Sequence, residues 1–396
     1  MLSVTEAQAA IYTHVPLLTI TQTGLRELTG SVLAESIFME RDQPPFQRVM
    51  MDGIAVRSSA TTRDFRIVGT QAAGAPPILL TKDDECIEVM TGAELPVGCD
   101  CVIPVEQIKR SADRAQLLES TAISPWLNVH RRGSDAMQGR SILQPGVRLG
   151  ATEVAVLASA GYATAQVRQS PRIALVSTGD ELVEPGEPIQ NWQIRRSNTY
   201  ALRSALEQHG HRQVIDRHLA DDLPLLRHTI DVLLQENDVL ILSGGVSMGQ
   251  FDYVPQVLTE LGVQCIFHKV EQRPGKPMWF GIRNDGKVVY ALPGNPVSTL
   301  ICLYRYVLPG LLRSMAAATI PDEQITLQSA VKAHPELSIF MPVRLKHDDQ
   351  AGILAEPCPT RGSGDFISLL GTQGFVELPP AQGMIDAGTL VPFYRW

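Results

Sequence analysis

Four polar segments of the chain follow apolar, strand-like runs and contain residue types that bind anions or metal ions. They are Ser177–Glu181, Ser243–Gly249, Lys269–Lys276 and Pro293–Pro296. In an open α/β sheet, ligands bind beyond the carboxyl ends of the strands, so residues directly after a strand are well placed to meet a ligand. We therefore treat these four segments as candidate binding segments.

The segment Ser243–Gly249 carries the adjacent glycines Gly244 and Gly245 between the hydroxyl side chains of Ser243 and Ser247. Paired glycines let successive backbone N–H groups converge on an anion ahead of a helix. The segment is not a Walker phosphate loop, because no Gly-Lys-Ser/Thr follows, and it does not match Gly-x-Gly-x-x-Gly. It indicates an anion site, although a tight turn alone would explain the same residues.

Carboxylates recur after the predicted strands, together with a hydroxyl and a flexible glycine. Carboxylate oxygens are the ligands that Mg²⁺ prefers, and this ion keeps bound waters and bridges to phosphates. Each carboxylate alone is explained by a helix cap or a surface position, but their recurrence at one sheet edge favours a Mg²⁺ site. The residues are Thr178, Gly179 and Glu181 in one segment, and Asp221 and Asp252 in two others.

Positive charge gathers in the third segment, where Lys269, Arg273 and Lys276 lie within eight residues of an otherwise acidic chain. A solvated loop is the ordinary explanation of such a run. Because the run follows a predicted strand, it could also face the same ligand as the glycine pair. The fourth segment places Pro293 and Asn295 in a rigid turn before a helix, and this turn needs no ligand for its structure.

Alternating apolar strands and helical stretches predict the elements that position these segments. Such alternation indicates a doubly wound, mostly parallel sheet with helices on both faces. Strands are expected at 173–177, 214–219, 239–242, 263–267, 278–282 and 288–292, and helices near 200–208, 223–235, 253–261 and 297–312.

The rest of the chain is predicted to form short helices and two β domains. Ser3 and Glu6 make a capping box for an N-terminal helix, and a second helix is expected over 151–162. Short β-prone runs separated by Pro and Gly turns occupy residues 42–149, and the same pattern returns beyond about residue 321.

The composition excludes several classes of protein. Of 396 residues, 44% are apolar and 19% charged, which is ordinary globular usage and not that of a disordered, collagenous or coiled-coil chain. The 31 glycines and 27 prolines are too many for a helix bundle. The net charge of -8 argues against nucleic acid as a partner, so an anionic ligand needs a local site.

The six cysteines are scattered without Cys-x-x-Cys spacing, which indicates buried thiols in a reducing compartment and argues against a zinc site. The sequence shows neither a secretory signal nor an apolar run of 18 residues, so we expect a cytoplasmic location and no membrane partner.

The motifs, taken in order, resemble the molybdopterin molybdotransferase family of the MoeA and gephyrin E-domain proteins. The resemblance covers essentially the whole chain, and the fixed order of many weakly specific runs argues against chance. The matching runs are Pro44–Phe46, Met51–Gly53, Thr91–Ala93, Leu95–Pro96, Asn128–Val129, Arg132–Gly133, Ser177–Leu182, Ser243–Ser247, Asp252–Tyr253, Pro274–Pro277 and Leu292–Ser298.

This resemblance implies four subdomains and a homodimer. The subdomains are an elongated helical and linker part at 1–41 and 142–170, a β domain at 42–141, an α/β molybdopterin-binding domain at 171–318 and a C-terminal β barrel at 319–396. The cleft would be shared between the α/β domain of one subunit and the β domains of its neighbour. The molybdopterin adenylyltransferase and cofactor-receiving enzymes are possible further partners.

The reaction that the resemblance implies takes adenylylated molybdopterin and molybdate, with Mg²⁺, and yields molybdenum cofactor and AMP. The catalytic residues would be Asp52, Glu181, Asp221 and Asp252, the last three also as metal ligands. The substrate-binding residues would be Thr91, Thr178, Gly179, Ser243, Gly244, Gly245, Ser247, Lys269, Arg273, Lys276, Pro293, Asn295 and Ser368. Asp52 and Thr91 match positions with which the second subunit completes the site.

The chain departs from the family's pattern mainly in the β domain. Gln47–Met50 stand where the family usually shows a polar trio such as Asp-Asn-Ser, and His130 and Ser134 stand where it tends to show Arg and Glu. Arg273 replaces a usual lysine, and the two are not equivalent at a phosphate contact.

Two hypotheses of different class follow from this pattern. The first is an active molybdotransferase, favoured by the intact α/β motifs. The second is a non-catalytic molybdopterin-binding carrier or scaffold, favoured by the departures. A molybdopterin adenylyltransferase is a more distant alternative, against which the extra domains argue.

Overall fold

The computed structural model describes residues 1–246, 253–319, 321–348 and 352–396. The chain folds into two compact units. The larger consists of Met1–Glu35, Pro145–Val154 and Thr164–Trp396, and the smaller of Ser36–Gln144 and Ala155–Ala163. The four-subdomain boundaries stay a prediction. Within the described part of the chain, every helix is too short or too polar to cross a bilayer.

A six-stranded sheet forms the centre of the larger unit, in the order β17-β14-β18-β22-β21-β19. β17, β14, β18 and β22 pair in parallel, whereas β21 pairs antiparallel with both of its neighbours. The predicted mostly parallel sheet is therefore confirmed. The strands are β14 (Ile173–Thr178), β17 (Val214–Leu219), β18 (Val239–Ser243), β19 (Val263–His268), β21 (Trp279–Arg283) and β22 (Val288–Leu292).

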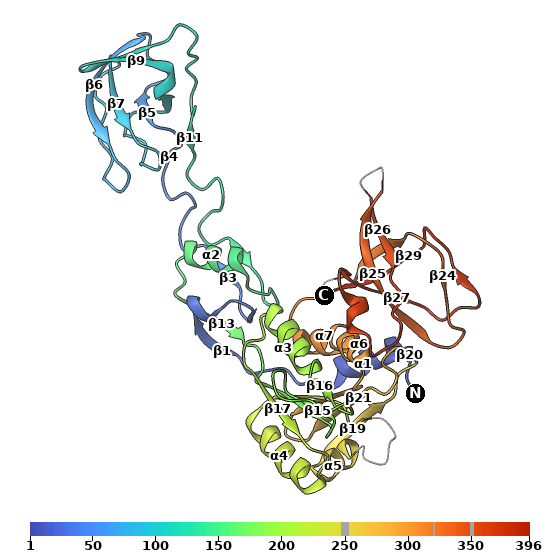
Figure 1. The fold of residues 1–396 in the computed structure, drawn as a ribbon. Helices are drawn as coiled ribbons and strands as arrows, with labels where there is room; N and C mark the ends of the chain where they lie inside the picture. The colour runs from blue at the N-terminus through green and yellow to red at the C-terminus, as the bar shows by residue number, and fades with distance from the viewer. Residues whose placement is uncertain (247–252, 320, 349–351) are drawn as a thin grey trace. The chain divides into compact units, whose positions relative to one another are not determined.

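Helices cover both faces of this sheet, as Figure 1 shows, because successive side chains of its buried strands point to opposite faces. One core contains Ile11, Leu202 and Ile301, and the other contains Leu226 and Val257. The first core lies between the sheet and α1, α3, α6 and α7. The second core lies between the opposite face of the sheet and α4 and α5. These helices are α1 (Val4–His14), α3 (Asn198–Gln208), α4 (Leu223–Glu236), α5 (Val254–Glu260), α6 (Pro296–Cys302) and α7 (Leu308–Ser314).

The predicted capping box starts α1. The Ser3 hydroxyl accepts from the N–H of Glu6, and the Glu6 carboxylate accepts from the N–H of Ser3 at 2.8 Å. These two bonds satisfy N–H groups that the first turn of a helix otherwise leaves without partners.

A single π-helical turn, Leu303–Val307, joins α6 to α7 where the sequence predicted one continuous helix. Pro309 accounts for the difference, because it has no N–H to donate to the carbonyl of Arg305, four residues earlier. The turn buries Arg305, which is 4% exposed. The Arg305 Nε donates to Glu377 Oε2 at 2.8 Å, which joins the helix to the C-terminal strands.

The C-terminal part of the larger unit is a closed five-stranded β barrel, which confirms the predicted barrel. Its strands pair in the order β25-β26-β23-β29-β27, and β27 pairs back with β25. β20 (Gln272–Arg273) pairs in parallel with β25 from the loop that follows β19. The barrel strands are β23 (Glu323–Leu327), β25 (Ser338–His347), β26 (Ile353–Pro357), β27 (Gly374–Leu378) and β29 (Leu390–Arg395).

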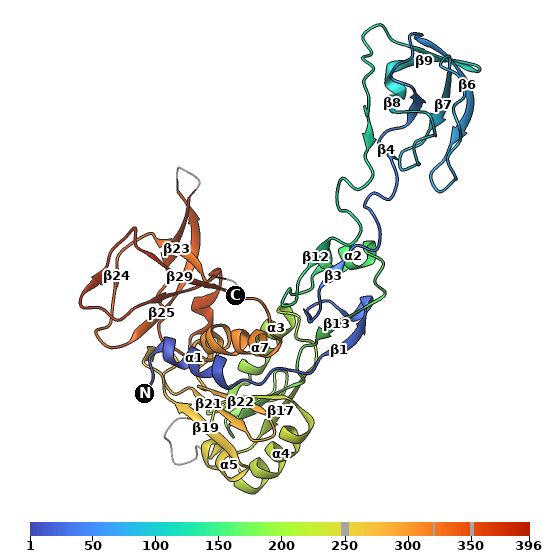
Figure 2. The same ribbon diagram turned by 180° about the vertical axis from the view of Figure 1, so that it is seen from behind.

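Shorter elements complete the larger unit. The three-stranded sheet β1-β13-β2 adjoins the turn η1, and η4 follows the barrel strand β26; Figure 2 shows β1 and β13 from behind. The bounds are β1 (Thr21–Gly24), η1 (Leu25–Glu27), β2 (Val32–Leu33), β13 (Thr164–Arg168), β15 (Leu182–Val183), β16 (Ile194–Arg195), β24 (Val331–Lys332), η4 (Phe366–Leu369) and β28 (Met384–Ile385).

The smaller unit contains a six-stranded sheet of order β8-β5-β7-β6-β10-β9 and two short strand pairs, β3 with β12 and β4 with β11. The predicted β-prone runs are strands here. A helix, α2 (Ala151–Ser159), forms where one was predicted; it begins in the larger unit and ends in the smaller one. The strands are β3 (Ile37–Phe38), β4 (Arg48–Val49), β5 (Gly53–Val56), β6 (Asp64–Gln71), β7 (Glu85–Val89), β8 (Cys101–Pro104), β9 (Ile108–Ser111), β10 (Arg114–Leu117), β11 (Val129–His130) and β12 (Ser141–Leu143), with the turn η2 (Val105–Gln107).

Candidate functional site

The loops that follow the parallel strands contact one another at the carboxyl edge of the central sheet. Gly294, after β22, lies beside Gly244, after β18: a Cβ added at Gly294 would be 3.5 Å from the Gly244 Cα. The N–H of Asp221, after β17, donates to Asp180 Oδ1, after β14, at 3.1 Å. Segments far apart in the sequence therefore form one continuous edge.

Thr178 ends β14 and faces the glycine pair. Its Oγ1 is buried and has no hydrogen-bond partner among the described residues. A Cβ at Gly244 would lie 2.9 Å from the Thr178 carbonyl oxygen, and one at Gly245 would lie 2.9 Å from Thr178 Oγ1. Leaving a buried hydroxyl without a partner costs roughly 1–3 kcal/mol. The arrangement suits a bound acceptor, such as a phosphate oxygen, beside the glycine pair.

The glycine pair also has the backbone conformation that glycine favours. Gly244 and Gly245 have φ values of 101° and 67°, in the region where an L side chain is strained. Ser243, at the end of β18, is buried just before them. Ser247 lies outside the described residues.

Asn198, the first residue of α3, holds two of these loops together and was not among the residues selected from the sequence. Its Nδ2 donates to Ser243 Oγ and to the Gly294 carbonyl oxygen, both at 2.8 Å. Its Oδ1 is buried and has no hydrogen-bond partner within the described ranges. The signal in the sequence was the polar run Ser197–Thr199, but a helix start explains such a run equally well.

The three predicted metal ligands are only partly within the described residues. Glu181 is exposed, and its carboxylate lies against Gly179, where an added Cβ would be 2.5 Å from Glu181 Oε2. Asp221 is half-buried, and Asp252 lies outside the described ranges. In those ranges no group of three or more His, Cys, Asp or Glu side chains could hold a metal ion. Glu181 and Asp221 nevertheless provide the carboxylate oxygens that Mg²⁺ prefers, so they fit this ion in chemistry.

The three basic residues lie on one loop between β19 and β21. Lys269 has a positive φ of 77°, and Arg273 and Lys276 are exposed. Gly275 fixes the loop against α6, because a Cβ there would lie 2.9 Å from Cys302 Sγ and 2.6 Å from Gln272 Nε2. The loop thus presents Arg273 and Lys276 to solvent from a closely packed base.

Gln272 connects this basic loop to the π-helical turn. It is 1% exposed, its Oε1 accepts from the Tyr306 hydroxyl, and its Nε2 donates to the Pro274 carbonyl oxygen at 3.2 Å. The neighbouring Arg305 binds Glu377 of the barrel. Only the tertiary structure reveals this path from the barrel to the basic loop.

The turn after β22 is fixed by its own hydrogen bonds. Pro293 is buried, and its carbonyl oxygen accepts from the Thr299 hydroxyl. Asn295 is exposed and precedes α6 without a side-chain capping bond. Its side chain is therefore available at the carboxyl edge.

Ser368 belongs to η4, which packs against α6. Its hydroxyl donates to Asp365, and this bond is the main reason why the pKa of Asp365 is below its usual value. A second contact joins the same region to the edge, since the N–H of Val297 donates to the Ser363 carbonyl oxygen at 2.9 Å. The segment that carries Ser368 therefore lies close to the amino end of α6.

Asp52 and Thr91 lie together in the smaller unit. The N–H and the hydroxyl of Thr91 donate to Asp52 Oδ1 at 2.6 and 2.7 Å. The backbone bond is the largest cause of a lowered pKa for Asp52, so this carboxylate is ionised at neutral pH. It also lines a cavity of about 220 Å³ whose wall includes Ile54 and Val105.

Three of the residues that depart from the family's pattern, Arg48, His130 and Ser134, belong to one network with Asp135. Arg48 Nη2 lies 2.8 Å from His130 Nδ1, and His130 Nε2 lies 2.7 Å from Asp135 Oδ1. Because an arginine can only donate, Nδ1 accepts and the ring proton on Nε2 is donated to Asp135. Ser134 adds a weak contact to the same Oδ1 at 3.4 Å. These three residues and Asp135 therefore form a connected local network.

The fold and the carboxyl edge define a class: multidomain α/β proteins with a polar, glycine-lined edge of the central sheet and a C-terminal β barrel. Family descriptions match the chain in three consecutive ranges. These are "MoeA N-terminal region (domain I and II)" at 2–161, "Probable molybdopterin binding domain" at 174–313 and "MoeA C-terminal region (domain IV)" at 324–396.

Relatives and solved structures agree over the full length. The molybdopterin molybdenumtransferase of Synechocystis sp. is 42% identical, with 100% of both chains covered, and that of Haemophilus influenzae is 30% identical, with 99% of both covered. The crystal structure of a molybdopterin biosynthesis MoeA protein from Pyrococcus horikosii is 30% identical, with a TM-score of 0.76, and covers 100% of this chain and 99% of its own. The chain belongs to the MoeA family.

Proposed function

We propose that this enzyme of molybdenum cofactor biosynthesis inserts molybdate into adenylylated molybdopterin and releases AMP. The observation that carries the proposal is the buried Thr178 hydroxyl, which has no partner among the described residues and faces Gly244 and Gly245. The full-length relatives named molybdopterin molybdenumtransferase support the same activity.

The substrate's two phosphates account for the residue types at the edge. Backbone N–H groups of the glycine pair and the Thr178 hydroxyl would donate to phosphate oxygens. Arg273 and Lys276 would neutralise the charge of the pyrophosphate or of molybdate. In the reaction an oxygen of water or molybdate forms a bond to one phosphorus of the pyrophosphate while the bridging phosphorus–oxygen bond breaks, so AMP leaves and molybdopterin keeps its own phosphate. Catalysis would consist mainly of positioning and of electrostatic stabilisation of the departing phosphate.

Glu181 and Asp221, with Asp252 beyond the described residues, would hold Mg²⁺. When bound, this ion supplies positive charge that polarises a phosphoryl oxygen and orients the leaving phosphate. Asp52, ionised by its bonds to Thr91, would complete the site from a second subunit of a homodimer. A cytoplasmic location, and transfer from a molybdopterin adenylyltransferase to cofactor-receiving enzymes, belong to the same proposal.

The direct test mixes the purified protein with adenylylated molybdopterin, molybdate and Mg²⁺ and measures AMP. We expect molybdate-dependent release, and binding without release at any molybdate concentration would refute the enzymatic function. Asp221→Ala and Asp252→Ala should fold normally and lose turnover.

Asp222→Ala is a matched control for Asp221→Ala. Asp222 is the adjacent residue, and its carboxylate caps α4 by accepting from the N–H of Leu225 at 2.8 Å. Its loss should lower stability by about 1 kcal/mol and leave turnover intact. If Asp221→Ala behaves in the same way, Asp221 has a structural role only.

A carrier or scaffold function is the second candidate, and the network of Arg48, His130 and Asp135 favours it. In that case the glycine loop would still bind the nucleotide, whereas exchange of Asp52 would not alter any reaction. Asp52→Asn therefore separates the two functions. If the protein is the enzyme, this variant should lose AMP release. If the protein is a carrier, the variant should bind the nucleotide as the wild type does.

A further inference from the structure

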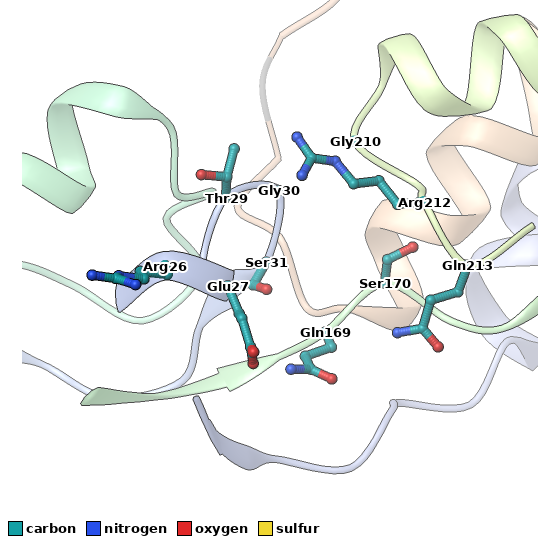
Figure 3. A pocket seen from close by; sticks show the side chains of 10 residues that line it. All are labelled: Arg26, Glu27, Thr29, Gly30, Ser31, Gln169, Ser170, Gly210, Arg212 and Gln213. Atoms are coloured by element: carbon teal, nitrogen blue, oxygen red, sulfur yellow. The ribbon is translucent and has the colours of Figure 1, made fainter. Parts of the chain in front are cut away.

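A polar cavity of about 360 Å³ lies in the larger unit, away from the carboxyl edge. Figure 3 shows that its walls come from η1 and the turn after it, from the segment that precedes β14, and from the loop that precedes β17. Ser170 lies just before β14 and Gln213 just before β17. The cavity is therefore at the amino ends of two strands whose carboxyl ends carry Thr178 and lead to Asp221.

The lining is mostly polar. Its polar side chains include the hydroxyls of Thr29, Ser31 and Ser170 and the amides of Gln169 and Gln213. Among the lining residues that the structure describes, there is no aromatic side chain and no purely apolar one. A ligand that needs a stacking surface, such as a nucleobase, finds none here. The cavity fits a small molecule that forms hydrogen bonds over most of its surface.

Charge in the cavity favours an anion. Arg26 and Arg212 both belong to the lining, with the single carboxylate of Glu27, and both are exposed; Figure 3 shows that the Arg26 side chain extends away from Arg212. No side chain within the described ranges forms a hydrogen bond or ion pair with either arginine. Arg148 lies behind this wall, where a Cβ on Gly210 would lie 3.1 Å from its Nη2, and that Nη2 donates to the His209 carbonyl oxygen. In a chain of net charge -8, such a local excess of guanidinium groups favours a bound oxyanion.

One hydroxyl of the lining is held by a buried histidine. Ser170 Oγ lies 2.7 Å from Nδ1 of His211, which is 1% exposed. Burial lowers the pKa of His211 to about 3, so its ring is neutral at physiological pH. In the tautomer that donates from Nδ1, the Ser170 oxygen accepts from the ring, and within the described part of the chain its own hydrogen has only a long contact of 3.5 Å with the Pro171 carbonyl oxygen. A ligand oxygen in the cavity would be a nearer acceptor for that hydrogen.

Two glycines make this wall rigid. Gly30 and Gly210 have φ values of 89° and 78°, and a Cβ on Gly30 would lie 3.1 Å from the Gly210 carbonyl oxygen. The two backbones therefore lie so close that a side chain at Gly30 would force its neighbour to move. Arg148 also donates to the His209 carbonyl oxygen, which fixes the loop before Arg212. The polar groups of the cavity are thus held in place by tightly packed backbone.

We propose that this cavity binds a small oxyanion that also carries hydroxyl groups, such as a phosphorylated or carboxylated polyol. Arg212 binds the oxyanion, and the hydroxyl and amide side chains bind the ligand's hydroxyls. The six residues of β14 span about 20 Å, so the ligand does not compete with a molecule at the carboxyl edge. The site does not depend on the proposed enzymatic function.

Calorimetric titration of the full-length protein at low ionic strength tests the proposal. The probes are glycerol 3-phosphate, glycerate, inorganic phosphate and glycerol. We expect saturable binding of glycerol 3-phosphate or glycerate, at least tenfold tighter than that of glycerol. The tighter of the two identifies phosphate or carboxylate as the preferred oxyanion. No saturable binding of either, or equal binding of glycerol, would overturn the proposal.

Variants assign the binding to this cavity. Arg212→Gln and Ser170→Ala should each weaken binding of the glycerol 3-phosphate or glycerate probe, the former at least tenfold. Arg227→Gln, which changes an arginine of α4 outside the cavity, and Lys276→Gln at the carboxyl edge should leave it unchanged. If Lys276→Gln abolishes binding and Arg212→Gln does not, the probe binds at the carboxyl edge and the proposal is wrong.

Discussion

Gly245→Ala should place a methyl group where the glycine loop has no room for one. The new Cβ would lie 2.7 Å from Val254 Cγ2 and 2.9 Å from Thr178 Oγ1. Carbon atoms in contact prefer about 3.5–4.0 Å, so the loop or its neighbour must move by about 1 Å. The residue also keeps a φ of 67°, which costs an alanine about 1–2 kcal/mol.

These terms predict both a stability change and an activity change. Backbone strain and overpacking together should lower the free energy of unfolding by about 2–5 kcal/mol. A shift of about 1 Å in a group that positions the reacting phosphate should lower turnover about 100-fold. Molybdate-dependent release of AMP measures the second effect, and urea denaturation followed by circular dichroism measures the first.

Gly286→Ala is the control for backbone strain. Gly286 has a φ of 86° in the turn between β21 and β22, and a Cβ there meets only Pro16, at an ordinary 3.7 Å. This variant should lose about 1–2 kcal/mol of stability and keep full activity. If Gly245→Ala turns over within threefold of the wild type, the glycine pair does not position the substrate and the argument from its geometry fails.

Three further predictions concern stability. Arg305→Met should cost about 3–5 kcal/mol because, among the described residues, it removes the only cation beside the largely buried Glu377 carboxylate and leaves it the Tyr394 hydroxyl alone, whereas Arg305→Met with Glu377→Leu should recover most of that loss in urea denaturation; equal losses would contradict this. The depressed pKa of His211, about 3, has burial as its main cause, followed by the charges of Arg148 and His209. The unfolded chain therefore binds more protons at this position than the folded one. This group's contribution to the free energy of unfolding falls as pH decreases from about 6.5 toward 3, by about 2 kcal/mol at pH 5. Melting curves of His211→Asn should lack this contribution. Ser3→Ala should lower stability by about 1 kcal/mol through loss of the α1 cap, and a variant as stable as the wild type would show that this end of α1 is frayed.

The elements of the α/β sheet were predictable because their causes are local in the sequence. The capping box of Ser3 and Glu6 and the fully buried run Ile173–Thr178 each specify an element from neighbouring residues. The prediction of one helix over 297–312 was wrong in one respect, since a π turn interrupts it. Pro309 was visible in the sequence, but the buried pair of Arg305 and Glu377 was not.

Some residues of the candidate site could likewise be predicted from the sequence, and others could not. Gly244, Gly245 and Thr178 could be selected from the sequence, because their types and places after strands suggest an anion site. Asn198 could not, because a polar residue at a helix start has an ordinary local explanation. Asn198 connects two loops of the site through hydrogen bonds to Ser243 and Gly294, which are distant from it in the chain. The assignment of Mg²⁺ and of the individual site residues stays a prediction.

The sequence by itself determined the fold class, the family and the residues that can bind phosphate, since periodicity, turn chemistry and motif order are properties of short segments. The tertiary structure alone decided which of these residues meet, because pairing of β14 with β17 and β18 is what brings their loops to one edge. It also produced the cavity of Arg26, Ser170 and Arg212, whose residues form no motif. They become neighbours only where the backbones at Gly30 and Gly210 cross.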